Sequence, residues 1–311
     1  MNYASFDISL AAVIPAILLA VFVFIKDKTE KEPLPFLVLL FGLGAIIFIP
    51  AYVAEQTLIS FFDRIFFEFF EFSSEGAVTV LSETAHYWHR ALCYLVGVGL
   101  VEEGLRFLVL FLITRRSKHF NYLFDGLVYA VFLSMGFAAA ENVFYAWVNG
   151  WDTLLLRSVS SVPSHLFFAI TMGCFYTMWH TCWLAKRTER LYAAEGRITL
   201  VKPFSTGGWL AAAIILPTLV HGAYRFVGYF SSSTLTLGFY LLTVLLYLAC
   251  FLGINRMADA DIEKNRSVMT LLCRKYPMLV VTDETGTASV TGADGTSATV
   301  NAEEEEVSDD A

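Results

Sequence analysis

The sequence predicts an all-α fold, a polytopic bundle of about seven transmembrane helices. Hydrophobic residues make up 57% of the 311 residues and charged residues only 16%, and the mean hydropathy is +0.60. Soluble domains contain roughly 45–50% apolar residues. Seven apolar runs also reach the length of about 20 residues that a helix needs to cross a bilayer. The lipid bilayer is therefore the expected surrounding of this chain, and no feature indicates nucleic-acid binding.

The seven runs are separated by short polar connections. They cover residues 8–25, 34–54, 91–113, 123–147, 161–185, 209–229 and 235–254. The first run is not a signal peptide, because it lacks a basic start and a small-x-small cleavage site. Sixteen of the 21 lysines and arginines lie in the connections after the first, third, fifth and seventh runs, and three lie in the alternate connections. The positive-inside rule then places the N-terminus outside and the C-terminus in the cytoplasm.

Two segments lie outside the apolar runs. Residues 60–72 (SFFDRIFFEFFEF) carry too many charges to cross a bilayer and many phenylalanines, which predicts a helix in the membrane interface. From about Thr282 the chain is rich in Gly, Ser, Thr, Ala and acidic residues, and this tail holds much of the net charge of -8. Such a composition buries no core. We therefore expect a transmembrane domain over 1–275 and an acidic, disordered cytoplasmic tail over 276–311.

The third run is interrupted by VEEGLR, which places Glu102, Glu103 and Arg106 among apolar residues. An ionisable side chain inside a bilayer costs at least ~2.5–3.5 kcal/mol, so its presence favours a function. Residues three and four apart are neighbours on a helix, so the arginine can reach either carboxylate. It can hold one glutamate ionised and leave the other as a general base. From this spacing alone, which is common on any helix, a structural salt bridge that joins two helices is the favoured interpretation.

Three later runs also contain polar residues. The fourth includes GFAAAEN, which ends in Glu141 and Asn142, and its small residues favour the close approach of another helix. The fifth contains His165 and the sixth contains His221 after Pro217, a proline that can break the helix and free backbone groups. A single histidine in a span is usually a packed residue. Several ionisable groups on four spans favour a shared site.

The order of these motifs resembles the PrsW family of intramembrane proteases. EExxR is followed by FDGLVYA…GFAAAENVFY, then by a histidine in PxHxxFxxxxG, then by a His-Gly pair in a late span. KEPLPFLVLLFGLGA also resembles the family's entry to its second helix, and the likeness runs from about Lys31 to Arg225. The family belongs to a wider group of glutamate-dependent membrane proteases that includes the CAAX prenyl endopeptidases and the Abi proteins.

The resemblance implies an active site built from a water-activating glutamate pair, two assisting histidines and a polar pocket. The residues implied as catalytic are Glu102, Glu103, Glu141, His165 and His221, with Arg106 and Asn142 in support. Arg106 stands where the family usually has a lysine, so the charge is kept. Arg225 stands where the wider group often has Asn or Asp, and we leave it outside the predicted site.

Hydrolysis of a peptide bond inside a membrane needs water, a base, and donors or a cation for the oxyanion. Glutamate and histidine can act directly or by holding a metal. A zinc site of the His2Glu kind needs three ligands and an open position, and Glu103, His165 and His221 would provide them. The sequence contains no HExxH motif. A glutamic and a zinc-dependent mechanism both stay open at this stage.

Other function classes remain to be weighed. Ionisable residues inside spans also mark transporters and proton relays, which more typically show inverted repeats, and we find none. A CAAX-type endopeptidase is the enzymatic alternative, and an inactive scaffold is the third. The resemblance implies a protein of the bacterial cytoplasmic membrane that cuts a single-pass membrane protein. A site-1-type cleavage of an anti-sigma factor in a stress response is the specific expectation.

Overall fold

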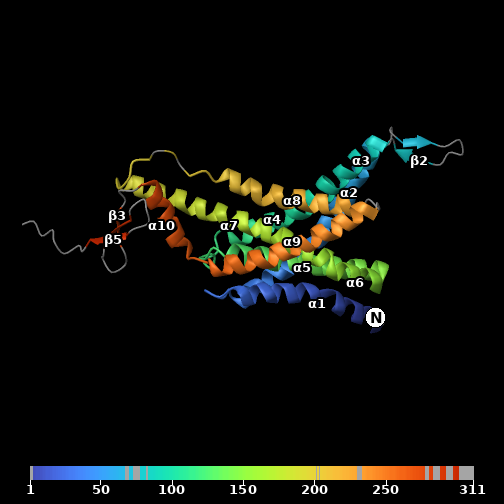
Figure 1. Ribbon diagram of the computed structural model, residues 1–311, viewed down its shortest axis with the longest axis horizontal. Coiled ribbons are helices and arrows are strands. Elements are labelled where there is room, and N and C mark those ends of the chain that lie inside the picture. The colour runs from blue at the N-terminus through green and yellow to red at the C-terminus, as the bar shows by residue number, and fades with distance from the viewer. Residues whose placement is uncertain are drawn as a thin grey trace, which may run out of the picture. The chain divides into compact units, whose positions relative to one another are not determined.

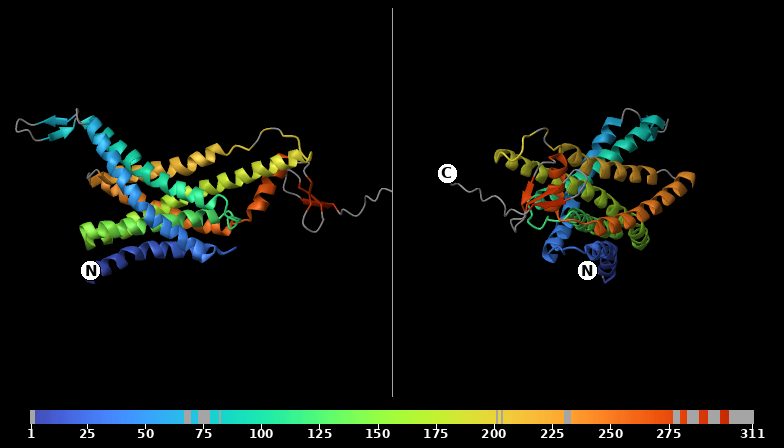
Figure 2. Two further views of the ribbon diagram at one scale, coloured as in Figure 1. Left: turned by 180° about the vertical axis from the view of Figure 1, so that it is seen from behind. Right: turned by 60° about the vertical axis from the view of Figure 1, so that its left-hand side comes forward.

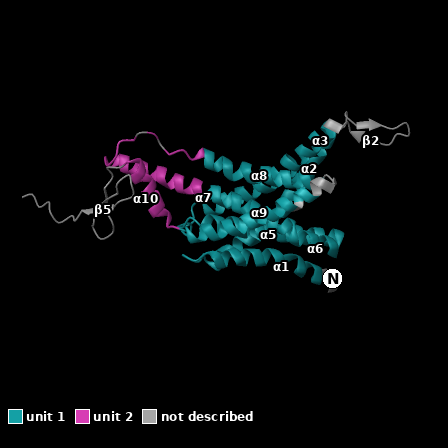
Figure 3. Ribbon diagram, in the orientation of Figure 1, with its two compact units in different colours: residues 1–177, 208–261 teal, residues 178–207, 262–311 magenta. Residues whose placement is uncertain are grey.

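A computed structural model describes residues 3–66, 70–72, 78–81, 83–200, 202, 204–229, 233–276, 280–282, 288–291 and 297–300. The chain divides into two compact units, shown in Figure 3. Unit 1 comprises residues 1–177 and 208–261, and unit 2 comprises residues 178–207 and 262–311. All candidate site residues named above fall in unit 1.

Unit 1 is helical apart from one short hairpin (Figure 1). Its helices are α1 (Tyr3–Lys26), α2 (Leu34–Phe66), α3 (Glu83–Leu92), η2 (Cys93–Leu100), α4 (Val101–Thr114), α5 (Asp125–Asn149), α6 (Trp151–Val159), the first half of α7 (Ser161–Ala194), α8 (Gly207–Tyr229) and α9 (Ser233–Asp259). The predicted all-α membrane bundle is confirmed for the described residues.

Six stretches of the described residues are helical, long and apolar enough to cross a membrane. They are Phe6–Lys26, Leu34–Phe66, Asp125–Asn149, Trp151–Ala194, Gly207–Tyr229 and Leu237–Asp259. The remaining predicted run, 91–113, also forms helix, but it is divided into η2 and α4 and holds three charged residues. The count of seven spans and their orientation therefore stay predictions.

Helix α5 forms the centre of unit 1. Its residues from Asp125 to Ala139 are buried without exception, and α2 crosses the bundle obliquely against it (Figure 2). A side chain on Gly136 would collide with the backbone of Phe41, and one on Gly44 with the backbone of Leu133. The small residues of GFAAAEN therefore allow a close helix approach, as the sequence predicted.

A second close approach brings α8 against η2, a π-helical segment directly before Glu102 and Glu103. A Cβ on Gly99 would lie 2.8 Å from the carbonyl oxygen of Thr218, and a Cβ on Gly222 would lie 2.8 Å from the Cα of Leu95. Short π-helical segments often occur at functional sites. Here α4, with its two glutamates, follows the π-helical segment directly. Gly99 and Gly222 let α8 pack close to this part of the chain.

The predicted interfacial helix over 60–72 is wrong in its bounds. Residues 60–66 continue α2, whereas β1 (Phe70–Phe72) pairs antiparallel with β2 (Val78–Leu81). The Phe-Glu-Phe and Val-Thr-Val stretches alternate side chains of high strand propensity, which favours a hairpin over a further helical turn. Residues 67–69 and 73–77 lie outside the described residues.

Unit 2 contains the second half of α7, α10 (Lys264–Lys275) and three short strands. Ala185 of α7 packs with Val268, Leu272 and Cys273 of α10. The strands β3 (Val280–Thr282), β4 (Ala288–Thr291) and β5 (Ser297–Val300) form an antiparallel sheet in the tail for which we expected disorder. Val and Thr favour strands. The rest of the tail lies outside the described residues, and the division at 275 stays a prediction.

Candidate active site

Arg106 of α4 lies at the centre of a buried polar network. Its Nη2 donates hydrogen bonds to Glu102 Oε2 at 2.9 Å and to Glu103 Oε1 at 2.7 Å. Its Nη1 donates to Ser134 Oγ at 2.8 Å and lies 3.0 Å from Nδ1 of His165. All five residues are at most 2% exposed. The arginine thus reaches both glutamates at once, as the helical spacing predicted, and also joins α4 to α5 and α7.

His221 of α8 closes the network from the other side. Its Nδ1 lies 2.9 Å from Glu103 Oε1 and 3.9 Å from Glu102 Oε2. The imidazole stacks on the ring of Phe168, with centroids 4.5 Å apart and planes 18° apart. This contact exists because the glycines described above allow α8 to approach η2. Stacking fixes the ring plane, so Nδ1 stays directed at the glutamate pair.

His165 connects the arginine to Glu141. Because a guanidinium only donates hydrogen bonds, Nδ1 of His165 accepts from Arg106, and the ring proton lies on Nε2. Nε2 therefore donates to Glu141 Oε2 at 2.9 Å. Two further arginines form ion pairs with this carboxylate: Arg157 Nη2 at 2.7 Å and Arg225 Nη2 at 3.5 Å. Both ring nitrogens of His165 are thus engaged.

Two arginines and one glutamate of the network lie outside the predicted site. Glu55 of α2 is 6% exposed and lies close enough to Glu102, Glu141 and Arg225 for their charges to act on it. An ionisable residue directly after the apolar run 34–54 was the available sequence signal. Arg157 lies in a connection between apolar runs and carries no such signal. Arg225 lies inside the sixth apolar run, and the predicted site did not include it.

Charged groups of both signs meet in the network. They are Glu55, Glu102, Glu103, Glu141, Arg106, Arg157 and Arg225. Buried charges need partners of opposite sign. Arg106 alone contacts the glutamate pair, whereas two arginines contact Glu141.

A zinc ion does not fit the side chains as they are arranged. Both nitrogens of His165 are used by Arg106 and Glu141, and the guanidinium lies between His165 and the glutamate pair. No group of three or more His, Cys, Asp or Glu residues in the described part of the chain is placed to hold a metal. Zinc binding by Glu103, His165 and His221 would require these hydrogen bonds to rearrange, and it stays a prediction.

Asn142 does not join the network. Its Nδ2 donates to the carbonyl oxygen of Ala12 at 2.8 Å and so connects α5 to α1. Because residues 141 and 142 lie about 100° apart around a helix, they face different neighbours. The structure therefore brings together the five residues predicted as catalytic and Arg106, and it places Asn142 in a helix contact.

The fold and the site are those of an integral membrane enzyme whose acid–base groups lie inside the helical bundle. Residues 32–254 match the family model described as "PrsW family intramembrane metalloprotease". The chain therefore belongs to the PrsW family. It is a membrane peptidase, and the comparisons favour neither a transporter nor a CAAX-type endopeptidase.

Curated relatives named Protease PrsW cover most of the chain. The one from Oceanobacillus iheyensis is 30% identical over 254 residues, 81% of this chain and 94% of that protein. The one from Clostridioides difficile is 30% identical over 227 residues, 71% of this chain and 79% of that protein. The Bacillus subtilis relative is 27% identical over 229 residues, 71% of this chain and 83% of that protein. No solved structure matches the chain.

Proposed function

We propose that this peptidase hydrolyses a peptide bond of a membrane-protein substrate with water activated by Glu103. One observation carries the choice of Glu103. Its Oε1 is held by Arg106 and His221, whereas its Oε2 is buried and has no hydrogen-bond partner among the described residues. A buried carboxylate oxygen without a partner is costly, and a water molecule bound there would satisfy it.

The proposed reaction begins when Glu103 Oε2 accepts a proton from this water. The water oxygen forms a bond to the carbonyl carbon of the substrate, and the carbonyl oxygen takes the electron pair of the double bond. The pair returns as the bond between carbon and nitrogen breaks, and Glu103 delivers its proton to the leaving amine. The products are a carboxylic acid and an amine, which become a carboxylate and an ammonium when the acid proton passes to the amine, and the glutamate is regenerated. Such proton transfers typically contribute 10²–10⁴-fold in rate.

The other residues of the network act by positioning. Arg106 and the Nδ1 group of His221 hold the Oε1 side of Glu103, which directs Oε2 to the water. His165 fixes Arg106 relative to Glu141, because its Nδ1 accepts a hydrogen bond from the arginine and its Nε2 donates one to the carboxylate. Glu102 is the weaker candidate for the base, because neither of its carboxylate oxygens is among the buried atoms without a hydrogen-bond partner in the described part of the chain.

The test uses purified protein in proteoliposomes with a single-span protein as substrate. Glu103→Gln keeps the shape of the side chain and removes the base, so we expect a loss of at least about 100-fold in cleavage rate. Glu102→Gln should lose less. Glu195→Gln, which changes an exposed residue of unit 2, is the matched control. A Glu103→Gln protein that cleaves at the wild-type rate would refute the assignment.

Two further measurements address the alternatives. Ion flux across the same proteoliposomes tests the transporter interpretation, which predicts a flux that the Glu103 variant abolishes. Dialysis against a chelator, followed by an assay with and without added zinc, tests metal dependence independently of the choice of base. Cleavage that survives chelation would contradict the zinc prediction.

We infer further that the substrate is a single-pass membrane protein, such as an anti-sigma factor, cut near the outer face. The predicted orientation supports this, because it places the start of α7 and the end of α8 outside, and the network lies towards these ends. Proteomic comparison of bacterial membranes that contain wild-type protein or the Glu103→Gln variant would identify the substrate as a protein that accumulates intact. A substrate cut on its cytoplasmic side would contradict the inferred orientation.

A further inference from the structure

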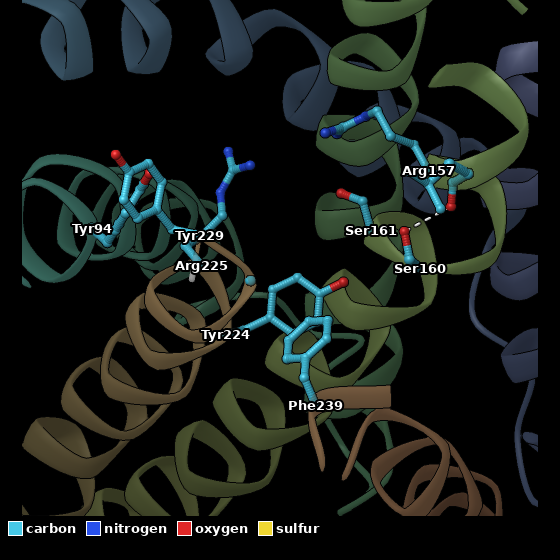
Figure 4. A pocket seen from close by; sticks show the side chains of 10 residues that line it. Tyr94, Arg157, Ser160, Ser161, Tyr224, Arg225, Tyr229 and Phe239 are labelled. Atoms are coloured by element: carbon cyan, nitrogen blue, oxygen red, sulfur yellow. Dashed lines mark hydrogen bonds between the residues drawn. The ribbon is translucent and has the colours of Figure 1, made fainter. Parts of the chain in front are cut away.

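A cavity of about 410 Å³ adjoins the network at Glu141 (Figure 4). Its lining comes from η2, α6, α7, α8 and α9 and consists of Tyr94, Leu156, Arg157, Ser160, Ser161, Tyr224, Arg225, Gly228, Tyr229 and Phe239. Figure 4 shows Arg157 and Arg225 on opposite sides, with both guanidinium groups directed towards the space between them. Aromatic rings and two serine hydroxyls form the rest of the wall.

The lining of the cavity is positively charged, because it contains two arginines and no acidic residue. Arg157 and Arg225 both form ion pairs with Glu141, so two guanidiniums share one carboxylate. The Nε atoms of both arginines are buried and have no hydrogen-bond partner among the described residues. Arg157 is 9% exposed as a residue, and the Arg225 side chain is 27% exposed. Donors in a buried cavity favour an anionic ligand that accepts from them.

The position of the cavity relates its ligand to the reaction. Arg225 lies 3.5 Å from Glu141, which lies 2.9 Å from His165, a residue bound directly to Arg106. The arginines of the cavity therefore lie two side-chain contacts from the residues that position the base. We therefore place the residue whose side chain enters the cavity a few positions from the cleaved bond, and the substrate series described below scans these positions.

The geometry points to a specificity subsite for an acidic side chain, Asp or Glu, of the peptide substrate. This inference rests on the proposed protease function. The two guanidiniums of the lining suit a carboxylate, because guanidiniums bind carboxylates with two parallel hydrogen bonds. The tyrosine and phenylalanine rings contact the aliphatic part of the acidic side chain and the neighbouring peptide. A lipid phosphate is the competing ligand, and the test distinguishes it.

The first experiment measures cleavage of a series of single-span substrates. A residue two to four positions from the cleaved bond is Glu, Gln or Lys in otherwise identical proteins. Wild-type protease should cleave the Glu substrate about tenfold faster than the Gln substrate, the effect of one charge-assisted hydrogen bond, and the Lys substrate most slowly. Arg225→Gln should remove this preference. Arg197→Gln, which changes an exposed arginine of unit 2, should retain it.

A second variant keeps the inference testable if the Arg225→Gln protein does not fold. Ser161→Asp adds a carboxylate inside the cavity itself, where it pairs with the arginines and competes with the substrate side chain. It should abolish the preference for the Glu substrate and leave cleavage of the Gln substrate intact. Equal cleavage of the Glu and Gln substrates by the wild-type protein would overturn the inference. The inference would also be overturned if Arg225→Gln lowered the cleavage rates of the Glu and Gln substrates by the same factor, because the preference would then be kept and Arg225 would have a structural role.

Binding separates this inference from the proposed mechanism. The Glu103→Gln protein should bind a fluorescent Glu peptide about tenfold more tightly than the matching Gln peptide, even if another residue proves to be the base. The measurement is repeated in vesicles of phosphatidylcholine and of phosphatidylglycerol. If the peptide affinity depends on phosphatidylglycerol through Arg225 and is the same for the Glu and Gln peptides, the cavity binds a lipid phosphate and the inference is wrong.

Discussion

Replacement of Arg106 should disable the site because one guanidinium serves four partners. It donates to Glu102 at 2.9 Å, to Glu103 at 2.7 Å and to Ser134 at 2.8 Å, and it lies 3.0 Å from His165. Arg106→Ala leaves two buried carboxyl groups without their cation. Removal of one partner of a buried ion pair costs about 3–5 kcal/mol. If this free energy is lost from the catalytically active conformation of the site, the cleavage rate drops roughly 150- to 5,000-fold.

Arg106→Lys separates charge from geometry. The ammonium group keeps the positive charge but has three donors on one atom, so it cannot replace both guanidinium nitrogens. We expect it to compensate the glutamate pair, to lose the contact with His165, and to retain much more activity than the alanine variant. A loss of about tenfold is the expected scale for one charge-assisted hydrogen bond.

The assay follows cleavage of a single-span substrate in proteoliposomes, and the thermal unfolding of each variant in detergent is measured in parallel. The ratio of the lysine and alanine rates is the decisive quantity. If the wild-type, lysine and alanine proteins cleave equally fast, Arg106 does not hold the glutamates, and the account of the network is wrong. A lysine protein as inactive as the alanine protein, with normal unfolding, would show that geometry matters more than charge.

Four further outcomes test other parts of the structure. Glu55→Gln should cleave the substrate faster than Glu55→Lys, because the amide is neutral whereas the lysine adds a fourth cation to the buried network. Gly222→Ala should lower the cleavage rate and should lower the free energy of unfolding by about 1–3 kcal/mol through overpacking, because its Cβ would lie 2.8 Å from a backbone carbon of η2. Gly104→Ala, with open space around the added Cβ, is the control. Burial, and then the Asp125 carboxyl at the start of α5, raise the pKa of Glu32 to about 8. The folded protein thus keeps a proton that the unfolded chain releases, so stability should fall as the pH rises from the ordinary glutamate pKa to about 8. Glu32→Gln should flatten this pH dependence of thermal unfolding. Ser161→Cys, in a background without other cysteines, should react with a membrane-impermeant thiol reagent added outside, and labelling only from the cytoplasmic side would contradict the orientation.

Elements whose signal lies in composition and spacing were predicted correctly from the sequence. Long apolar runs identified the transmembrane bundle, since a bilayer requires about 20 apolar residues per helix. The three- and four-residue spacing in VEEGLR placed Arg106 against Glu102 and Glu103, because these contacts lie within one helix. The wrong assignments had weaker local signals. Residues 60–72 are amphipathic as a helix but also contain the short alternating stretch of β1.

The sequence by itself determined that this chain is a membrane protein with ionisable residues inside its spans, and that these include two glutamates, an arginine and two histidines in the order of the PrsW family. Only the tertiary structure decided which of them touch. The contact of His221 with Glu103, the use of both His165 nitrogens, and the inclusion of Glu55, Arg157 and Arg225 join residues far apart in the chain. Such contacts depend on how closely helices approach and how they are rotated, and packing of the whole bundle sets both. The spacing of residues along the chain specifies neither the distance between two helices nor their rotation.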